Sequence, residues 1–304
     1  MIVTITLNPC IDKSTSVPEI KPEAKLRNTE VINEPGGGGI NVSKALAKLG
    51  IDSSALFPSG GHNGDMLKNL LKAEKIPFHS IDSKVETREN WIVGEANTGK
   101  QFRFTFPGRE VEEGAIKEML EELQSFAPSF VVASGSMPPG LPDNFYGLVV
   151  KYACAAGAKC IVDTSGEALK GLKGKGAYLI KPNISELCKL LGIEKLDLLE
   201  VDDAAQQLIQ NGYAELVAVS MGGDGAWLVS ADEKHFTPAP KVEVKTTVGA
   251  GDSMVAGITY MLYKNEPLQN AIRFGVCCGS GATMNAGTEL FKVEDVWRLY
   301  HAMQ

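Results

Sequence analysis

The chain has few of the features that mark secreted, membrane-bound or nucleic-acid-binding proteins. No apolar run approaches the roughly 20 residues that a membrane-spanning helix needs. The opening residues, MIVTITL, form a β-like run without the basic region or cleavage site of a signal peptide. No dense run of Lys and Arg offsets the net charge of −7, which argues against nucleic acid or an anionic membrane as the main partner. We therefore expect a cytoplasmic protein.

The six cysteines also lack a pattern. They stand at positions 10, 154, 160, 188, 277 and 278 without a CxxC pair or histidine ligand spacing, so we expect reduced thiols and neither a disulfide framework nor a zinc site. Two nucleotide-binding signatures are missing as well. GxxxxGK[ST] occurs nowhere, and no GxGxxG follows the first β-like run. These absences exclude a Walker A loop and disfavour a dinucleotide-dependent oxidoreductase.

What the chain does contain is an alternation of short β-branched runs with helical patterns. The strand candidates are residues 2–7, 53–57, 130–134, 160–163, 178–180, 216–220 and 226–229, and the helix candidates are residues 64–74, 113–126, 144–156, 185–191, 203–211 and 251–263. Continuous apolar strands that alternate with helices are typical of parallel sheets buried on both faces. The sequence therefore predicts an α/β fold with a mostly parallel, doubly wound sheet, in one domain over residues 1–304.

Two stretches break this alternation. Residues 15–34 and 91–106 lack helical periodicity and are rich in β-forming residues, and NTG at 97–99 suits a hairpin turn. We expect a small antiparallel lid formed by segments near 13–35 and 88–107. Two separate excursions at the edge of the main sheet are the alternative.

The most specific motif is TVGAGDS at residues 247–253, which precedes a helical pattern and follows the strand-like residues 242–247. Gly249 and Gly251 leave backbone N–H groups unobstructed at a helix N-terminus, which binds anions. Asp252 can cap this helix, and it can also accept a proton from an attacking hydroxyl. We favour the chemical role, because phosphoryl transfer needs little beyond positioning and charge stabilisation.

A second glycine-rich motif lies near the N-terminus. PGGGGINVS at 35–43 runs directly into a helical pattern, where glycines allow close backbone approach and Asn41 can bond to sugar hydroxyls; a flexible loop is the alternative. Asn8 and Asp12 follow the first strand, at the edge of an open sheet where ligands bind. The basic residues in or beside the lid segments are either solvated surface charges or a clamp for a phosphate on the acceptor: Lys25, Arg27, Arg88 and Arg103.

Three other segments have a nucleotide-binding character. They are KPNISE at 181–186, where Asn183 is placed to cap the following helix, SMGGDGA at 220–226, and CGSGATMNAG at 278–287. Each is equally compatible with ordinary turns and helix packing.

These motifs together resemble the ribokinase-like PfkB carbohydrate kinases, and the resemblance extends over essentially the whole chain. Within the family, KLR at 25–27, TREN at 87–90, QFRF at 101–104, SGSMPPG at 134–140 and DTSGEA at 163–168 resemble the branch of minor-type ATP-dependent 6-phosphofructokinases. The tagatose-6-phosphate kinase and 1-phosphofructokinase branches tend to carry GGKG, whereas residues 36–39 are uninterrupted glycine. The resemblance therefore implies phosphorylation of the C1 hydroxyl of fructose 6-phosphate, with those two activities as alternatives.

The resemblance also implies a role for individual residues. Asp252 is the base and Gly249, Ala250 and Gly251 form the anion hole; Asp12, Gly37, Gly38, Asn41 and Ser136 bind the sugar; Lys25, Arg27, Arg88 and Arg103 lie near its phosphate. ATP is bound by Lys181, Asn183, Ser220, Gly222, Gly225, Thr247 and Asn285, and Glu186 organises Mg²⁺ through water. A K⁺ site is implied at Thr246, Val248, Ala282, Asn285 and Gly287.

The chain departs from the family pattern at two positions. Thr246 stands where Asp, Asn or Ser is common, and Glu289 stands where the branch tends to have Arg. A homodimer that pairs through the lid is implied. A sugar-phosphate sensor without catalytic activity is the alternative from another functional class. The intact Asp252 motif argues against it, since a pure binder has no need of a base.

Overall fold

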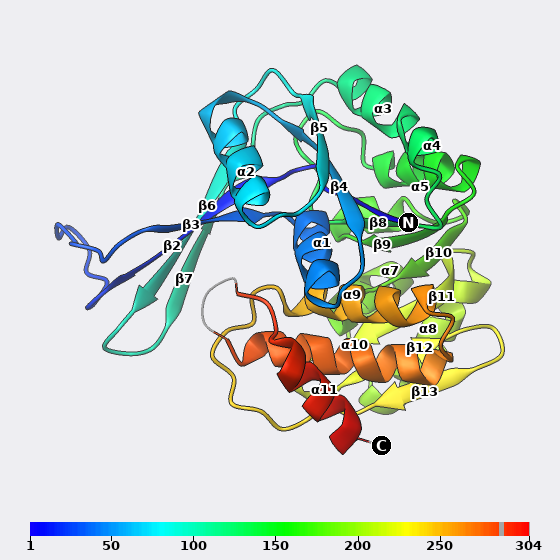
Figure 1. Ribbon diagram of the computed structural model, residues 1–304. Helices are drawn as coiled ribbons and strands as arrows, with labels where there is room; N and C mark the ends of the chain where they lie inside the picture. Colours follow the sequence, from blue (N-terminus) through cyan, green and yellow to red (C-terminus); the bar gives the residue numbers. More distant parts are fainter. Residues whose placement is uncertain (286–288, 304) are drawn as a thin grey trace.

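A nine-stranded sheet forms the centre of the molecule (Figure 1). The computed structural model describes residues 1–285 and 289–303. The strands of the sheet, in the order β13-β12-β11-β10-β9-β8-β1-β4-β5, are Lys234–Thr237, Ala226–Val229, Ala214–Ser220, Ala177–Ile180, Lys159–Asp163, Phe130–Ser134, Ile2–Ile5, Ser53–Ser59 and Phe78–Asp82. From β11 to β5 every neighbouring pair is parallel, whereas β12 and β13 are antiparallel.

Helices cover both faces of this sheet, which explains why its inner strands are buried throughout. One face packs against α3 (Glu113–Glu121), α4 (Leu123–Phe126), α5 (Phe145–Ala155), α6 (Gly166–Lys170), α7 (Ile184–Leu191) and α8 (Val201–Gln210). The other packs against α1 (Gly38–Lys48), α9 (Ala250–Tyr263), α10 (Leu268–Thr283) and α11 (Val293–Ala302), while α2 (Gly61–Ala73) covers β4. Two short 3₁₀ helices complete the described elements: η1 (Leu198–Glu200) and η2 (Gly222–Asp224). The predicted α/β class is confirmed.

A second sheet of four strands projects from the body, at the left of Figure 1. Its order is β3-β2-β6-β7, with bounds Ile32–Gly36, Cys10–Val17, Arg88–Glu95 and Gln101–Thr105. The outer pairs are antiparallel as expected, and β6 and β7 meet at the predicted turn, where Gly99 has a positive φ. The central pair β2–β6 is parallel, so the prediction of a wholly antiparallel lid was wrong at that pair. β2 and β6 run side by side because each starts at the same end of the main sheet.

Several predicted boundaries were also wrong. Residues 242–247, read as strand-like, form no strand, because their backbone runs along the surface and bonds to the end of α10 through Thr283. The β-forming run 27–34 becomes a strand only from Ile32. Strands β5 and β13 were missed, since both lie at sheet edges and carry mixed polar residues. None of the described helices is long and apolar enough to cross a membrane.

The topology brings several chain segments to one edge of the main sheet. Parallel strands end on the same side, so the residues that close β8, β9 and β10 lie next to one another at their carboxyl ends. The N-termini of α1 and α9 also reach this edge, and these two helices pack against each other. The small sheet projects from the body next to this edge of the main sheet (Figure 1).

Candidate active site

Asp252 lies in the first turn of α9, at the carboxyl edge of the sheet. Its side chain does not cap the helix. Instead Oδ2 accepts a 2.9 Å hydrogen bond from Nδ2 of Asn41, and Oδ1 accepts a 3.3 Å bond from Oγ of Ser134. The carboxylate is thus aimed by two other elements, α1 and β8, which is what a positioned base requires and a simple cap does not.

The environment of Asp252 raises its pKa to about 6. Burial is the main cause and the negative charge of Asp163 is the next, while the bonds from Asn41 and Ser134 and the charge of Lys181 work in the opposite direction. A carboxylate with a pKa just below neutral is ionised at pH 7 yet binds a proton more readily than an ordinary aspartate. That balance suits general-base chemistry.

A buried ion pair stands beside this carboxylate. Nζ of Lys181, which follows β10, lies 3.2 Å from Oδ1 of Asp163 at the end of β9. Burial alone would lower the pKa of Lys181, but the carboxylates of Asp163, Glu186 and Asp252 raise it, so the lysine stays charged. A Cβ placed on Gly251 would lie 3.6 Å from this Nζ. The ammonium group therefore adjoins the N-terminus of α9, where an anion would be stabilised by both.

The glycine run 36–39 has a packing role within the protein itself. Added Cβ atoms would fall 2.2 Å from Oδ2 of Asp12 at Gly36, 2.3 Å from Oγ of Ser134 at Gly38 and 2.4 Å from the carbonyl of Ile5 at Gly39. Gly37 has φ +116°, which disfavours other residues. These glycines are needed so that the protein itself can pack closely, and the flexible-loop alternative was wrong because α1 starts at Gly38.

At the acceptor end, Asp12 is buried on β2 and held by its neighbours. Oδ1 accepts bonds from Nδ2 of Asn90 at 2.9 Å and from the thiol of Cys10 at 3.3 Å. Burial and the charge of Asp12 raise the pKa of Cys10, and the charges of Arg88 and Asp252 also act on this thiol. Asp12 thus contacts this thiol directly, and Arg88 and Asp252 are near enough for their charges to influence it.

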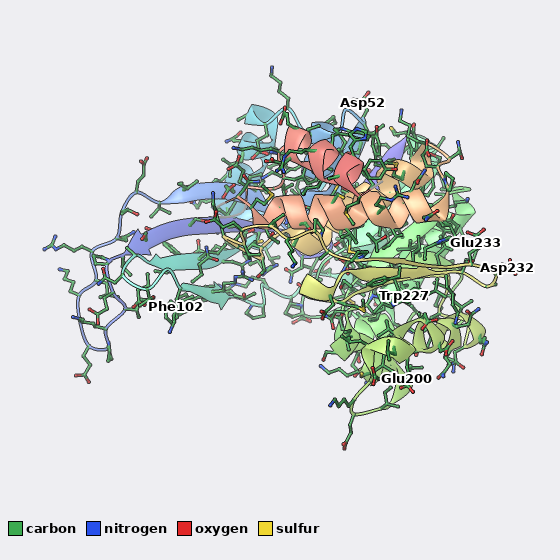
Figure 2. All side chains as sticks on the ribbon, turned by 90° about the horizontal axis from the view of Figure 1, so that it is seen from below. Asp52, Phe102, Glu200, Trp227, Asp232 and Glu233 are labelled. Atoms are coloured by element: carbon green, nitrogen blue, oxygen red, sulfur yellow. The ribbon has the colours of Figure 1, made fainter. Side chains whose placement is uncertain are left out.

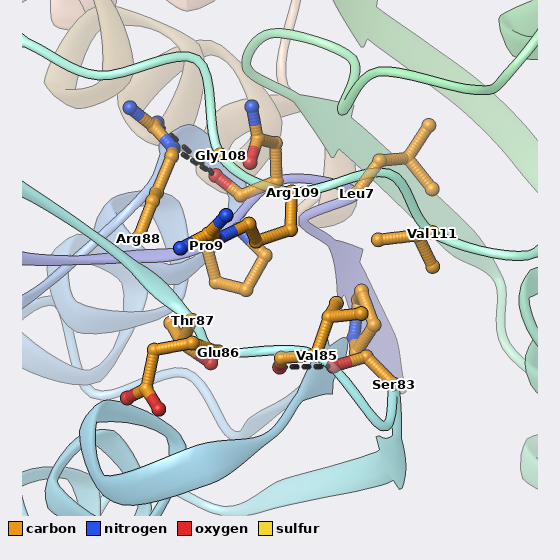
Figure 3. Close-up of a pocket in the computed structure, with 12 residues that line it drawn as sticks. Leu7, Pro9, Ser83, Val85, Glu86, Thr87, Arg88, Gly108, Arg109 and Val111 are labelled. Atoms are coloured by element: carbon orange, nitrogen blue, oxygen red, sulfur yellow. Dashed lines mark hydrogen bonds between the residues drawn. The ribbon is translucent and has the colours of Figure 1, made fainter.

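Arg88 is fixed by backbone and amide oxygens on three sides. Nε and Nη2 donate to the carbonyl of Asn8 at 3.2 and 3.1 Å, and Nη1 donates to Oδ1 of Asn90 and to the carbonyl of Phe106. Nδ2 of Asn8 in turn donates to Oγ of Ser136 at 3.2 Å. In Figure 3, dashed lines mark the bonds from Arg88 to the carbonyl of Asn8. The figure also shows Arg109 next to Pro9; the sequence analysis did not single out Arg109. Arg88 and Ser136, both predicted at the acceptor, are thus joined through Asn8.

The other three predicted basic residues of the lid are not part of this cluster. Lys25 and Arg27 are exposed in the loop between β2 and β3, at the far end of the projecting sheet, and form no hydrogen bond or ion pair with the described residues (Figure 1). Arg103 lies on β7 and donates from Nη2 to Oγ1 of Thr247 at 3.2 Å. It therefore connects the lid to the phosphate-transfer motif, and the expected four-residue clamp does not form within one chain.

On the nucleotide side, Asn183 and Glu186 form a reciprocal capping box at the start of α7. Oδ1 of Asn183 accepts from the backbone of Glu186, and Oε2 of Glu186 accepts from the backbone of Asn183, each at 2.9 Å. The predicted cap is confirmed. Asn183 also bridges to Ser220, at the end of β11, so KPNISE and SMGGDGA are adjacent. Gly222 and Gly225 have positive φ, and Gly225 packs on the carbonyl of Thr237.

The predicted K⁺ residues also lie together. Backbone N–H groups of Lys245 and Thr246 donate to the carbonyl of Thr283, next to Ala282, and Nδ2 of Asn285 donates to the carbonyls of Gly281 and Leu290. Oγ1 of Thr246 accepts from the backbone of Val248 and faces Gln101 of the lid at 3.4 Å. Gly287 lies outside the described residues. Among the described residues, no three His, Cys, Asp or Glu side chains converge as a metal site.

Two residues of the site had no role in the sequence analysis. Ser134 and Asp163 each close a buried strand, and both touch the charged centre through Asp252 or Lys181. Their signal in the sequence was a polar residue at the carboxyl end of a predicted parallel strand.

A comparison with known families identifies the chain. The profile of the pfkB family carbohydrate kinases matches residues 1–294. The chain belongs to the pfkB family. This pfkB kinase is 40% identical over 301 residues to ATP-dependent 6-phosphofructokinase isozyme 2 of Escherichia coli strain K12, covering 98% of this chain and 97% of the relative. It is 34% identical over 294 residues to 1-phosphofructokinase of Bacillus subtilis strain 168, covering 96% of each.

Solved structures of phosphofructokinase-2 from E. coli share the fold of this pfkB kinase. The complex with potassium has a TM-score of 0.95 at 40% identity, and the complex with fructose-6-phosphate has 0.94 at 38%, each covering 99% of this chain and 98% of the other. The tetrameric inhibited form of that enzyme has a TM-score of 0.93 at 38% identity, with the same coverage. The predicted family and fold are confirmed.

Proposed function

We propose that this pfkB kinase transfers the γ-phosphoryl group of ATP to the C1 hydroxyl of fructose 6-phosphate, as a 6-phosphofructokinase that serves glycolysis. The single observation that carries the proposal is the aimed carboxylate of Asp252 at an open helix N-terminus, with the buried Lys181 beside it. A sensor that only binds ligands would need neither a base with a raised pKa nor a cation at that position.

In the proposed reaction, Asp252 accepts the proton of the C1 hydroxyl as the oxygen attacks the γ-phosphorus. The bond from phosphorus to the bridging oxygen of ADP breaks in line. Backbone N–H groups at Gly249, Ala250 and Gly251 and the ammonium of Lys181 stabilise the charge on the transferred group. Asn41 and Ser134 keep the carboxylate directed at the hydroxyl.

For the acceptor, Oδ2 of Asp12 and the residues Gly37, Gly38, Asn41 and Ser136 bind the sugar ring, and Arg88 binds its phosphate. The network of Asn8, Asn90 and Arg88 supports this assignment, because a fixed guanidinium loses little freedom on binding. The identity to 6-phosphofructokinase isozyme 2 supports fructose 6-phosphate as the acceptor, ahead of tagatose 6-phosphate and fructose 1-phosphate.

For the nucleotide, we propose that Asn183, Ser220, Gly222, Gly225, Thr247 and Asn285 surround ATP. Glu186 bonds the cap through Oε2 only, so Oε1 is left to hold Mg²⁺ through water. Bound Mg²⁺ would neutralise charge on the phosphates. The K⁺ site is proposed at the loop of Thr246 and Val248 against Ala282, supported by their proximity and by the potassium complex of the E. coli enzyme.

We further propose a homodimer in which the small sheet meets that of a second copy in the cytoplasm. Ile32, Phe102 and Phe104 are exposed on this sheet, with Phe102 visible in Figure 2, and a cavity of about 540 Å³ lies along it between Ile32 and Ile92. In such a dimer Lys25 and Arg27 would approach the partner's acceptor site, since they lie away from their own.

The experiment is ADP release by purified protein with Mg-ATP and a panel of fructose 6-phosphate, tagatose 6-phosphate, fructose 1-phosphate and fructose. The decisive quantity is kcat/KM. Fructose 6-phosphate should give the highest kcat/KM. A lead by another phosphorylated sugar would contradict the acceptor assignment but not the kinase, and no turnover with any sugar would contradict both.

A further inference from the structure

Among the described residues, Asn90 is the one side chain of the small sheet that hydrogen-bonds to both Asp12 and Arg88, the two predicted acceptor contacts. Its Nδ2 donates to Oδ1 of Asp12 at 2.9 Å and to Sγ of Cys10 at 3.2 Å. Its Oδ1 accepts from Nη1 of Arg88 at 2.9 Å and from the backbone of Phe106 at 3.3 Å. One amide thus joins a carboxylate on β2, a guanidinium on β6 and the end of β7.

The orientation of this amide is dictated by its partners. A flipped amide would turn its oxygen toward the Asp12 carboxylate and its N–H groups toward the donors of Arg88 and Phe106, so that these three contacts would be repulsive. An asparagine is also the right length, because the register of β2 and β6 sets Asp12 directly opposite Asn90. Aspartate at this position would supply only acceptors, and a shorter residue would reach neither partner.

The bonds from Asn90 leave the binding atoms of both partners available. Both bonds to Asp12 fall on Oδ1, so Oδ2 remains for a ligand hydroxyl. Four bonds occupy Nε, Nη1 and one N–H of Nη2 of Arg88, so an N–H of Nη2 remains for a ligand oxygen. Oδ2 lies beside Gly36, where a side chain would block it, since an added Cβ would come within 2.2 Å of this oxygen.

We propose that Asn90 is a positioning residue that couples the sugar-ring contact of Asp12 to the phosphate contact of Arg88. The inference rests on the proposed function, which gives Asp12 and Arg88 those roles. It adds that the two contacts are not independent: a sugar that bears both the hydroxyl and the phosphate gains from a shared hydrogen-bond network. Asn90 itself touches no reacting atom.

The test is a calorimetric titration of fructose 6-phosphate into the full-length protein without nucleotide. Asn90→Ala should raise the dissociation constant about 10–100-fold, since two charged partners lose a charge-assisted bond. Asn90→Asp keeps the size and an acceptor for Arg88 but loses the donor to Asp12, and should still weaken binding at least about fivefold. Asn90→Ala combined with Asp12→Asn should weaken it by at least about fivefold less than the product of the single effects.

Asn33→Ala is the matched control. Asn33 lies on β3 of the same sheet, on the face opposite to Asp12, and its side chain makes no hydrogen bond within the described chain, so the dissociation constant should stay within about twofold. Steady-state kinetics on the same preparations should show an increased KM for fructose 6-phosphate in Asn90→Ala and an unchanged KM for Mg-ATP. If Asn90 had only a structural role, its replacement would change both KM values or neither.

The outcomes separate the two proposals. If the wild type releases ADP and Asn90→Asp binds fructose 6-phosphate as the wild type does, or the single effects multiply, the role of Asn90 is overturned alone. If the wild type binds the sugar phosphate but releases no ADP, the kinase assignment fails while the binding ratios still decide on Asn90. If the wild type does not bind it at all, both are overturned.

Discussion

The amide of Asn41 donates a 2.9 Å hydrogen bond to the carboxylate of Asp252 across 211 positions of the chain. Asn41 belongs to the glycine-rich motif at 35–43, and Asp252 to the motif at 247–253. The two most distinctive segments of the sequence therefore meet at one bond. The acceptor end and the phosphate-transfer end therefore form a single site.

Replacement of the base should affect turnover far more than binding. Asp252→Asn keeps the size of the side chain and its bond from Asn41 but cannot take a proton, so we expect kcat to fall roughly 10²–10⁴-fold. The dissociation constant for fructose 6-phosphate should change by less than about threefold. Steady-state kinetics and calorimetry measure the two quantities. Asp232→Asn, at the exposed turn between β12 and β13 (Figure 2), is the control. Near-normal kcat in Asp252→Asn would contradict the role.

The pH profile should follow the ionisation of Asp252. Its pKa of about 6 implies that kcat/KM falls about tenfold per pH unit below that value, because the protonated carboxyl cannot act as a base. Asp163→Asn removes the neighbouring charge that raises this pKa, so the acidic limb should move to lower pH. An acidic limb that moves to higher pH in this variant, or does not move, would show that another group controls it.

The same carboxylate should reduce the stability of the folded protein. Because its folded pKa lies above the ordinary value of 3.8, the folded state holds the proton more tightly, and stability is lost as pH rises from about 4 to about 6. Asp252→Asn lacks this loss. At pH 8 we expect it to exceed the wild type by about 3 kcal/mol in free energy of unfolding, with a difference near zero below pH 4. Denaturant titrations at both pH values test this, and equal stability at pH 8 would contradict it.

The glycine run should tolerate no side chain where the protein packs against it. In Gly38→Ala the new methyl would lie 2.3 Å from Oγ of Ser134 and under 3 Å from the backbone of residues 134–135. We expect a loss of about 1–3 kcal/mol in stability and a lower kcat, because Ser134 orients Asp252. Gly114→Ala in α3 is the control, since its methyl would enter open space and should stabilise the helix by about 0.5–1 kcal/mol. Similar behaviour of the two variants would refute this explanation.

The sequence predicted the parts of the fold that buried apolar runs encode. Strand β8 was predicted with its observed bounds, and most helices within a few residues, because full burial leaves a continuous apolar signal. The edge strands β5 and β13 were missed because a half-exposed strand with polar residues lacks that signal. The parallel pairing of β2 and β6 was missed for another reason: the alternation in a strand does not reveal the direction of its neighbour.

The candidate site was predictable wherever a motif carries its own chemistry. Asp252 and the capping pair of Asn183 and Glu186 needed only local spacing. Local spacing does not show which partner a long side chain will bond to in the folded protein. Arg88 was expected beside Arg103, yet Arg88 bonds to Asn8 while Arg103 bonds to Thr247. The two strands are neighbours, but Arg103 pairs with Ile92, further along β6 than Arg88.

The parallel pair at the centre of the small sheet also bears on the order in which the chain folds. β2 and β6 are 70 residues or more apart in sequence and cannot pair as a hairpin, so their pairing closes a long loop that contains β4 and β5. Loop closure of this length slows folding. Amide hydrogens of the small sheet should therefore be protected late during refolding and exchange early under mild denaturant. The acceptor site, which depends on β2 and β6, would be completed last and lost first.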